Sequence, residues 1–154
     1  MADPSAVLRG PHVLAYPYKR SLGPVLSRFF TSLRDRQFEG IRTREGKVLV
    51  PPQEYDPDTG EPLSEWVPVG PGGEIVSWSW VSKPRKKQPL DRPFAYALIR
   101  LDGADAPLLH AVDAGSEEKL SKGARVVPRW AQEPKGGIND VVCFALESES
   151  PEGK

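Results

Sequence analysis

The chain has 154 residues, of which 38% are hydrophobic and 27% are charged; this composition supports one compact domain and excludes intrinsic disorder. The formal net charge is zero, which excludes a protein that binds nucleic acid through its overall charge, so any basic site must be local. A single cysteine excludes an intramolecular disulfide bond and a four-cysteine metal site.

Residues 1–20 are rich in proline and glycine and lack a clear period, so we interpret them as an arm. Its residues Tyr16 and Tyr18 are candidates for packing against another chain. Neither a signal-peptide run nor a stretch of membrane-spanning length is evident. We therefore expect a cytoplasmic protein with no membrane partner.

Residues 21–40 carry the one clear helical pattern and predict an amphipathic helix with Ser21 as its N-cap and Pro24 in its first turn. Residues three and four positions apart form an apolar stripe, made of Leu22, Val25, Leu26, Phe29, Phe30 and Leu33. Adjacent helical positions are about 100° apart, so Phe29 and Phe30 are not expected to face the same core. Either the whole stripe packs on the protein's own core, or part of it contacts a partner protein.

Residues 41–65 contain the turn sequences REG and DPDTG and predict a small knuckle of hairpins. Residues 66–147 contain about five short strands, a number that fits an OB-type barrel and also an SH3-like barrel or a small sandwich. Residues 148–154 form a polar tail that we expect to be flexible. In the segment 74–82 either Val76, Trp78 and Trp80 or the opposite face, with Ile75 and Val81, must be the core face.

One loop concentrates positive charge, and its cations are Lys83, Arg85, Lys86, Lys87 and Arg92. Three interpretations stay open: a solvated loop, a contact to coenzyme A phosphates or an enzyme surface, and a single-stranded nucleic-acid site that also uses Trp78 and Trp80. Cys143 lies in an apolar run and is expected to be buried. No catalytic motif is present, so we do not expect the chain to be an enzyme by itself.

A set of glycine, proline and aromatic markers recurs at characteristic spacings along the chain: Phe38, Gly46, Pro51, Pro52, Pro57, Gly60, Ser77 and Trp78. With these markers, residues 29–146 resemble a family of small proteins that accompany acyl-CoA enzymes and combine an N-terminal helix, a rubredoxin-like zinc ribbon and an OB-fold barrel. The resemblance implies a mainly β fold: a five-stranded OB-fold barrel preceded by the helix and a degenerate zinc-ribbon knuckle.

Alignment on these markers puts the family's four metal positions at Arg42, Glu45, Asp56 and Thr59, with two, ten and two residues between them. A structural zinc site needs Cys or His donors, so we expect the ribbon to be kept and the metal to be lost. Arg42, Glu45 and Asp56 are then candidates for a salt-bridged replacement.

The stretch VPPQEYDPDTGEPLSEWV resembles the actinobacterial subset of this family that takes part in steroid side-chain breakdown. The resemblance implies a non-catalytic subunit of a thiolase-like, lipid-transfer-protein-type aldolase, which cleaves a β-hydroxyacyl-CoA by retro-aldol chemistry. It implies a two-plus-two heterotetramer, an acyl-CoA substrate for the complex and no cofactor in this chain. The expected partner-binding residues are Tyr16, Tyr18, Leu22, Leu26, Phe29, Phe30 and Leu33. The alternatives are an accessory subunit of a MaoC-like enoyl-CoA hydratase and a single-stranded nucleic-acid binder, which zero net charge disfavours.

Overall fold

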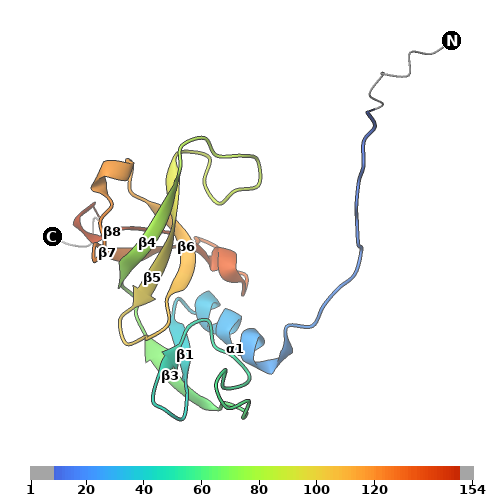
Figure 1. Cartoon of the computed structure of the whole chain (residues 1–154), viewed down its shortest axis with the longest axis vertical. Helices are drawn as coiled ribbons and strands as arrows, with labels where there is room; N and C mark the ends of the chain where they lie inside the picture. The colour runs from blue at the N-terminus through green and yellow to red at the C-terminus, as the bar shows by residue number, and fades with distance from the viewer. Residues whose placement is uncertain (1–8, 150–154) are drawn as a thin grey trace.

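A computed structural model describes residues 9–149 and shows a closed five-stranded barrel, a three-stranded sheet and one α-helix (Figure 1). The barrel strands are β4 (Gly73–Val81), β5 (Phe94–Leu101), β6 (Leu108–Asp113), β7 (Arg125–Trp130) and β8 (Val141–Leu146). They close in the order β4-β5-β6-β8-β7, and β6 pairs with β8 in parallel while the other pairs are antiparallel. This is the five-stranded Greek-key barrel of an OB fold, which confirms the fold that the family resemblance implies and decides among the three architectures that fit the number of strands.

A β-bulge in β4 decides which side chains enter the barrel. Ile75 is opposite Ile99 and Ser77 is opposite Leu98, so Val76 is the extra residue. The bulge reverses the alternation, and therefore Ile75 and the two tryptophans, Trp78 and Trp80, all pack against the same core. The core face thus combines residues from both of the faces that the sequence offered as alternatives.

A small sheet precedes the barrel and consists of β1 (Phe38–Arg42), β2 (Val48–Leu49) and β3 (Glu65–Val69) in the order β2-β1-β3. Two expected boundaries change as a result. The helix segment 21–40 contains the start of β1, and the barrel segment 66–147 contains most of β3, which pairs with β1 over five residues. We call the segment 38–69 the ribbon.

The helix α1 runs from Gly23 to Arg34, with Leu22 rather than Ser21 at its N-cap and Pro24 in its first turn. It ends because Arg36 adopts a left-handed conformation with φ 59°, which a helix cannot continue. It packs on β1 and on the 3-10 turn η2 (Ile138–Asp140). Phe29 and Leu33 belong to one core cluster with ribbon and barrel residues, so helix, ribbon and barrel form a single body.

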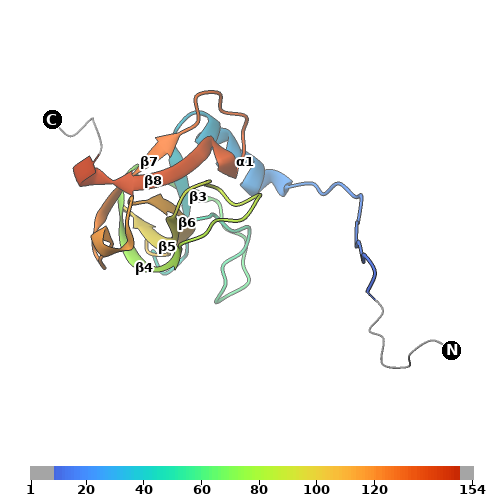
Figure 2. The same cartoon turned by 90° about the horizontal axis from the view of Figure 1, so that it is seen from above.

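Three further segments complete the described chain. The 3-10 turn η1 (Glu117–Lys119) lies between β6 and β7, and η3 (Glu147–Glu149) occupies the start of the segment expected to be a tail. Residues 9–22 run away from the body without regular structure (Figures 1 and 2). The expected arm residues 1–8 and tail residues 150–154 lie outside the described residues. Within residues 9–149 no helix has the length and apolar character needed to cross a membrane.

Candidate partner-binding surface

The residues that the family resemblance places at metal positions do not form the ion-paired cluster that was expected of them. Arg42 donates from Nε to Glu65 Oε1 at 2.9 Å and from Nη1 to the carbonyl oxygen of Gly46 at 3.1 Å. It pairs with neither Glu45 nor Asp56. The expected Arg42–Glu45–Asp56 cluster is therefore wrong, because β1–β3 pairing sets Arg42 opposite Glu65 and brings their side chains together.

Asp56 and Thr59 instead stabilise the turn that contains them. The carboxylate of Asp56 accepts hydrogen bonds from the N–H groups of Asp58, at 2.9 Å, and Thr59, at 3.3 Å. The bond from Asp58 holds the pKa of Asp56 below its usual value. A carboxylate held by its own turn in this way is the pattern of an Asx turn, and it needs no metal.

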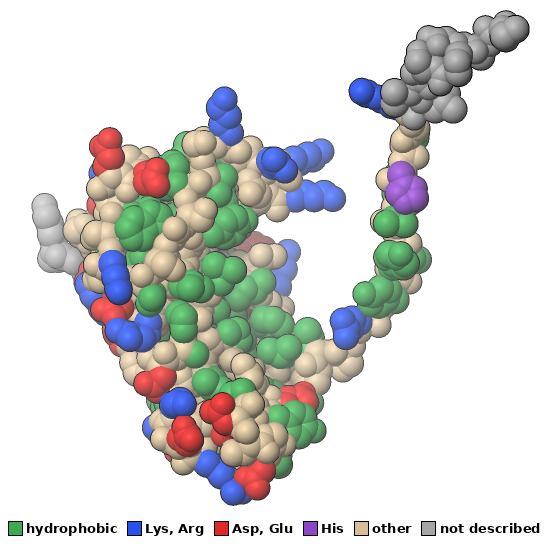
Figure 3. All heavy atoms as spheres, viewed as in Figure 1, with side chains coloured by type: hydrophobic (Ala, Val, Ile, Leu, Met, Phe, Trp, Pro, Cys, Tyr) green, Lys and Arg blue, Asp and Glu red, His purple; other side chains and the backbone are tan. Residues whose placement is uncertain are grey.

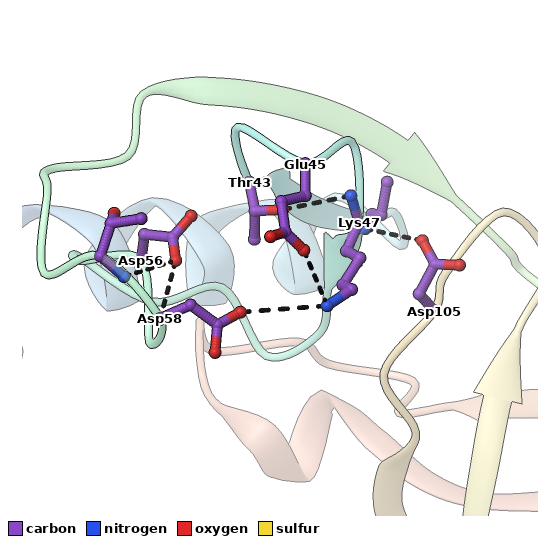
Figure 4. Close-up of polar contacts among 8 residues, drawn as sticks. Thr43, Glu45, Lys47, Asp56, Asp58 and Asp105 are labelled. Atoms are coloured by element: carbon purple, nitrogen blue, oxygen red, sulfur yellow. Dashed lines mark hydrogen bonds and ion pairs between the residues drawn. The ribbon is translucent and has the colours of Figure 1, made fainter.

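Ion pairs join the two turns of the ribbon (Figure 4). The Nζ of Lys47 lies 3.0 Å from Glu45 Oε2 and 3.9 Å from Asp58 Oδ2, and Arg44 pairs with Glu61 at 2.6 Å. The pKa of Lys47 is raised, chiefly by its bond to Glu45. Across the same region the N–H of Val48 donates to Asp105 Oδ2 at 2.8 Å, which ties the ribbon to the β5–β6 loop of the barrel.

These residues do not fit a structural zinc ion. Arginine is not a zinc ligand, and the carboxylates of Glu45 and Asp56 already have partners. Across residues 9–149 no group of three or more His, Cys, Asp or Glu side chains is placed to hold a metal ion.

The apolar stripe of α1 divides into a buried and an exposed part. Phe29 and Leu33 are 1% and 0% exposed, so they belong to the protein's own core and are not available to a partner, contrary to the sequence-based expectation. Phe30 and Leu26 are half-buried, and Leu22 is 48% exposed. The difference between Phe29 and Phe30 follows from their adjacent positions on the helix.

The arm continues the exposed part of the stripe. Tyr16 and Tyr18 are 72% and 67% exposed, and two residues that sequence reasoning missed, Val13 and Leu14, are 83% and 68% exposed. The space-filling view shows their hydrophobic side chains along the projecting segment (Figure 3). The sequence pattern that could have identified Val13 and Leu14 as exposed apolar residues is their position between two prolines of the arm. We call Val13, Leu14, Tyr16 and Tyr18, together with the exposed Leu22 and the half-buried Leu26 and Phe30, the arm–helix surface.

On the side that faces the ribbon, α1 contacts Glu39 and Trp66 through Arg28. Arg28 donates to both carboxylate oxygens of Glu39, at 3.1 and 2.7 Å, and its guanidinium lies 4.2 Å from the ring centroid of Trp66. The bond from Arg28 holds the pKa of Glu39 below its usual value. These contacts join the helix to strands β1 and β3 of the ribbon.

The five cations of the basic loop separate into two groups. Lys83, Arg85, Lys86 and Lys87 are exposed and form no ion pair with any described residue. Arg92 in contrast bonds to the mostly buried Asp113 at 2.5 Å.

Cys143 and His110 carry side chains of types that can act as a nucleophile or a base, and both belong to barrel strands. Cys143 is 1% exposed, as the sequence predicts, and burial raises the pKa of its thiol. His110 is partly buried; burial lowers its pKa, and its Nδ1 accepts a hydrogen bond from the N–H of Ala111. Both are therefore uncharged at neutral pH.

Comparisons with known proteins agree with this architecture. Residues 66–131 match the family model described as ChsH2, C-terminal OB-fold domain. The structure is similar to a protein of unknown function from the DUF35 family of Sulfolobus solfataricus, with a TM-score of 0.59 and 19% identity over 80% of this chain and 84% of that one. It is also similar to a chain of the Ltp2-ChsH2(DUF35) aldolase, with a TM-score of 0.60 and 16% identity over 83% of this chain and 98% of that one. Comparison with curated proteins gave no match. The sequence match thus covers the last residues of the ribbon and the barrel strands β4 to β7 but not β8, and the structural matches show that the two proteins share this chain's fold.

Proposed function

We propose that this chain is a non-catalytic accessory subunit of a thiolase-like, lipid-transfer-protein-type aldolase that cleaves a steroid side-chain β-hydroxyacyl-CoA by a retro-aldol reaction. The observation that carries the proposal is the structural likeness to a chain of the Ltp2-ChsH2(DUF35) aldolase, which extends over 98% of that chain. The match of residues 66–131 to the ChsH2 OB-fold domain supports the same assignment from sequence.

The surroundings of the reactive side chains support an accessory role. The thiol of Cys143 is buried with a raised pKa, which disfavours the thiolate needed for nucleophilic attack. The ring of His110 packs edge-on against Phe144, with centroids 5.5 Å apart. The catalytic groups of the proposed complex are therefore assigned to the partner.

The arm–helix surface is the proposed contact with that partner, in a two-plus-two assembly. Large aromatic side chains that become buried at an interface supply much of its binding energy, and Tyr16 and Tyr18 are such side chains. Leu22 and Leu26 extend the apolar area from the arm onto the body of the protein. This surface needs no charge to associate, which agrees with a chain of zero net charge.

The assembly is tested by co-expression with a lipid-transfer-protein-like thiolase and size-exclusion chromatography with light scattering. We expect a stable heterotetramer that the triple variant Tyr16→Ala, Tyr18→Ala, Leu22→Gln separates into its components. The control is Leu109→Gln, which changes a leucine of comparable exposure, 60%, on barrel strand β6 and should leave the complex intact. A thiolase-like chain that elutes separately from the wild-type protein would show that the proposal is wrong, and co-elution with a MaoC-like hydratase instead would assign the chain to that enzyme.

A further inference from the structure

We propose that the turn formed by residues 83–88 binds clustered phosphate groups of a small polyphosphorylated ligand. Four cations occur within five residues there, Lys83, Arg85, Lys86 and Lys87, and none is ion-paired within residues 9–149. Elsewhere on the ribbon and barrel the arginines have carboxylate partners, namely Arg42, Arg44, Arg92, Arg100, Arg125 and Arg129. Close like charges repel one another, so a group of unpaired cations favours a multivalent anion.

The turn holds one of its four cations, Lys87, in a strained backbone conformation. The N–H of Gln88 donates to the carbonyl oxygen of Arg85 at 3.1 Å, and the Gln88 side chain accepts from the N–H of Arg85 at 2.7 Å. Lys87 occupies the third position of this turn with φ 80°, a conformation that favours glycine. A lysine in a glycine conformation is strained, and such strain is concentrated at functional sites.

The loop that carries the turn is fixed on the barrel. Leu90 is 7% exposed and packs in a cluster with Phe94 and Cys143. Two residues on, Arg92 bonds to Asp113 Oδ2 at 2.5 Å, and Arg129 from β7 bonds to the same oxygen at 2.8 Å. An anchored loop loses less conformational entropy on binding than a free one, so the site is preorganised.

The surroundings favour phosphate groups over single-stranded nucleic acid. Binding of single strands uses aromatic side chains on which bases stack. Trp78 and Trp80 of the adjoining strand β4 pack against the core instead, and the most exposed aromatic residues within 9–149 are Tyr16, Tyr18 and Tyr55, all outside the barrel. The cations project toward the side of the molecule on which the arm lies (Figure 3). If the proposed function holds, the phosphates are those of the partner's acyl-CoA thioester, an identification that rests on that function.

Isothermal titration of the purified chain with inorganic pyrophosphate at low salt tests the site. We expect saturable binding that weakens as salt is added and that falls about two- to fivefold for each cation removed. Lys87→Gly should weaken binding without lowering the melting temperature, because glycine relieves the strained φ. The matched control is Arg36→Gly, which also removes a cation at positive φ, outside the loop, and should leave binding unchanged.

Three results would overturn the site: no saturable pyrophosphate binding, equal weakening by both glycine variants, or tighter binding of an oligothymidylate than of coenzyme A. Coenzyme A should bind and pantetheine, which lacks the nucleotide phosphates, should not. Binding of pyrophosphate with no preference for coenzyme A over pantetheine would keep the phosphate site and reject the thioester as its source. Because these titrations use the isolated chain, they are independent of whether a thiolase-like partner binds.

Discussion

At the scale of single residues, Asp140 organises the loop between β7 and β8. Its side chain accepts hydrogen bonds from the N–H groups of Lys135 and Gly136, both at 2.7 Å, and of Gly137 at 3.2 Å. Burial acts to raise the pKa of Asp140, but the three N–H donors outweigh it, and the pKa lies below its usual value. Since α1 packs on η2, this carboxylate also stabilises the segment against which the helix packs.

We expect Asp140→Ala to lower the free energy of unfolding by about 2–3 kcal/mol at pH 7, because three backbone N–H groups lose a charged, buried acceptor. A carboxyl group with a depressed folded-state pKa stabilises above its unfolded pKa of about 4, and this contribution is lost as the pH falls through the folded value. Urea unfolding of both proteins at pH 7 and pH 3 should therefore give a smaller difference at pH 3. Glu133→Ala, an exposed change in the same loop, is the control. An equal difference at both pH values would show that the carboxylate charge contributes nothing.

At the scale of elements, the sequence predicted the types of segment better than their pairing. The helical stripe, the short strands and the number of barrel strands follow from periodicity, which is a local property. The bulge at Val76 and the pairing of β3 with β1 depend on partners distant in sequence, so alternation alone could not choose between Ile75 and Trp78 as core residues. The C-terminal end of α1 was missed because a left-handed arginine gives no sequence signal of the kind glycine gives.

The ribbon is expected to fold without a metal, because its two turns are joined by Arg44–Glu61 and Lys47–Asp58 contacts and the positions that the resemblance assigns to metal ligands carry poor ligands. Each exposed ion pair contributes at most about 1 kcal/mol, so the paired sheet and its core residues must supply most of the stability. Elemental analysis should find no stoichiometric metal, and EDTA should not change the melting temperature. One equivalent of zinc that survives dialysis, and whose removal lowers the melting temperature, would contradict this expectation.

At the scale of the whole molecule, one compact body carries the arm and the basic turn on its surface. Helix, ribbon and barrel share a core that buries Phe29, Phe38 and Phe144. Two of the exposed features, the apolar arm and the basic turn without ion pairs within residues 9–149, extend toward the same side of the protein (Figure 3). Helical periodicity in the sequence predicted the helix residues of the arm–helix surface. The partner proposed here rests on the resemblance to a family and on the comparisons, because no physical property of an apolar surface specifies what covers it.

The central claim is that this chain supports an aldolase, and the rate of retro-aldol cleavage measures it most directly. The thiolase-like partner is assayed on a β-hydroxyacyl-CoA alone, with the wild-type chain, and with the arm–helix triple variant. We predict that the wild-type chain raises the cleavage rate until one chain is present per partner subunit, and that the triple variant gives the same rise only at higher concentration. A partner that cleaves its substrate equally fast with and without the wild-type chain would contradict the account.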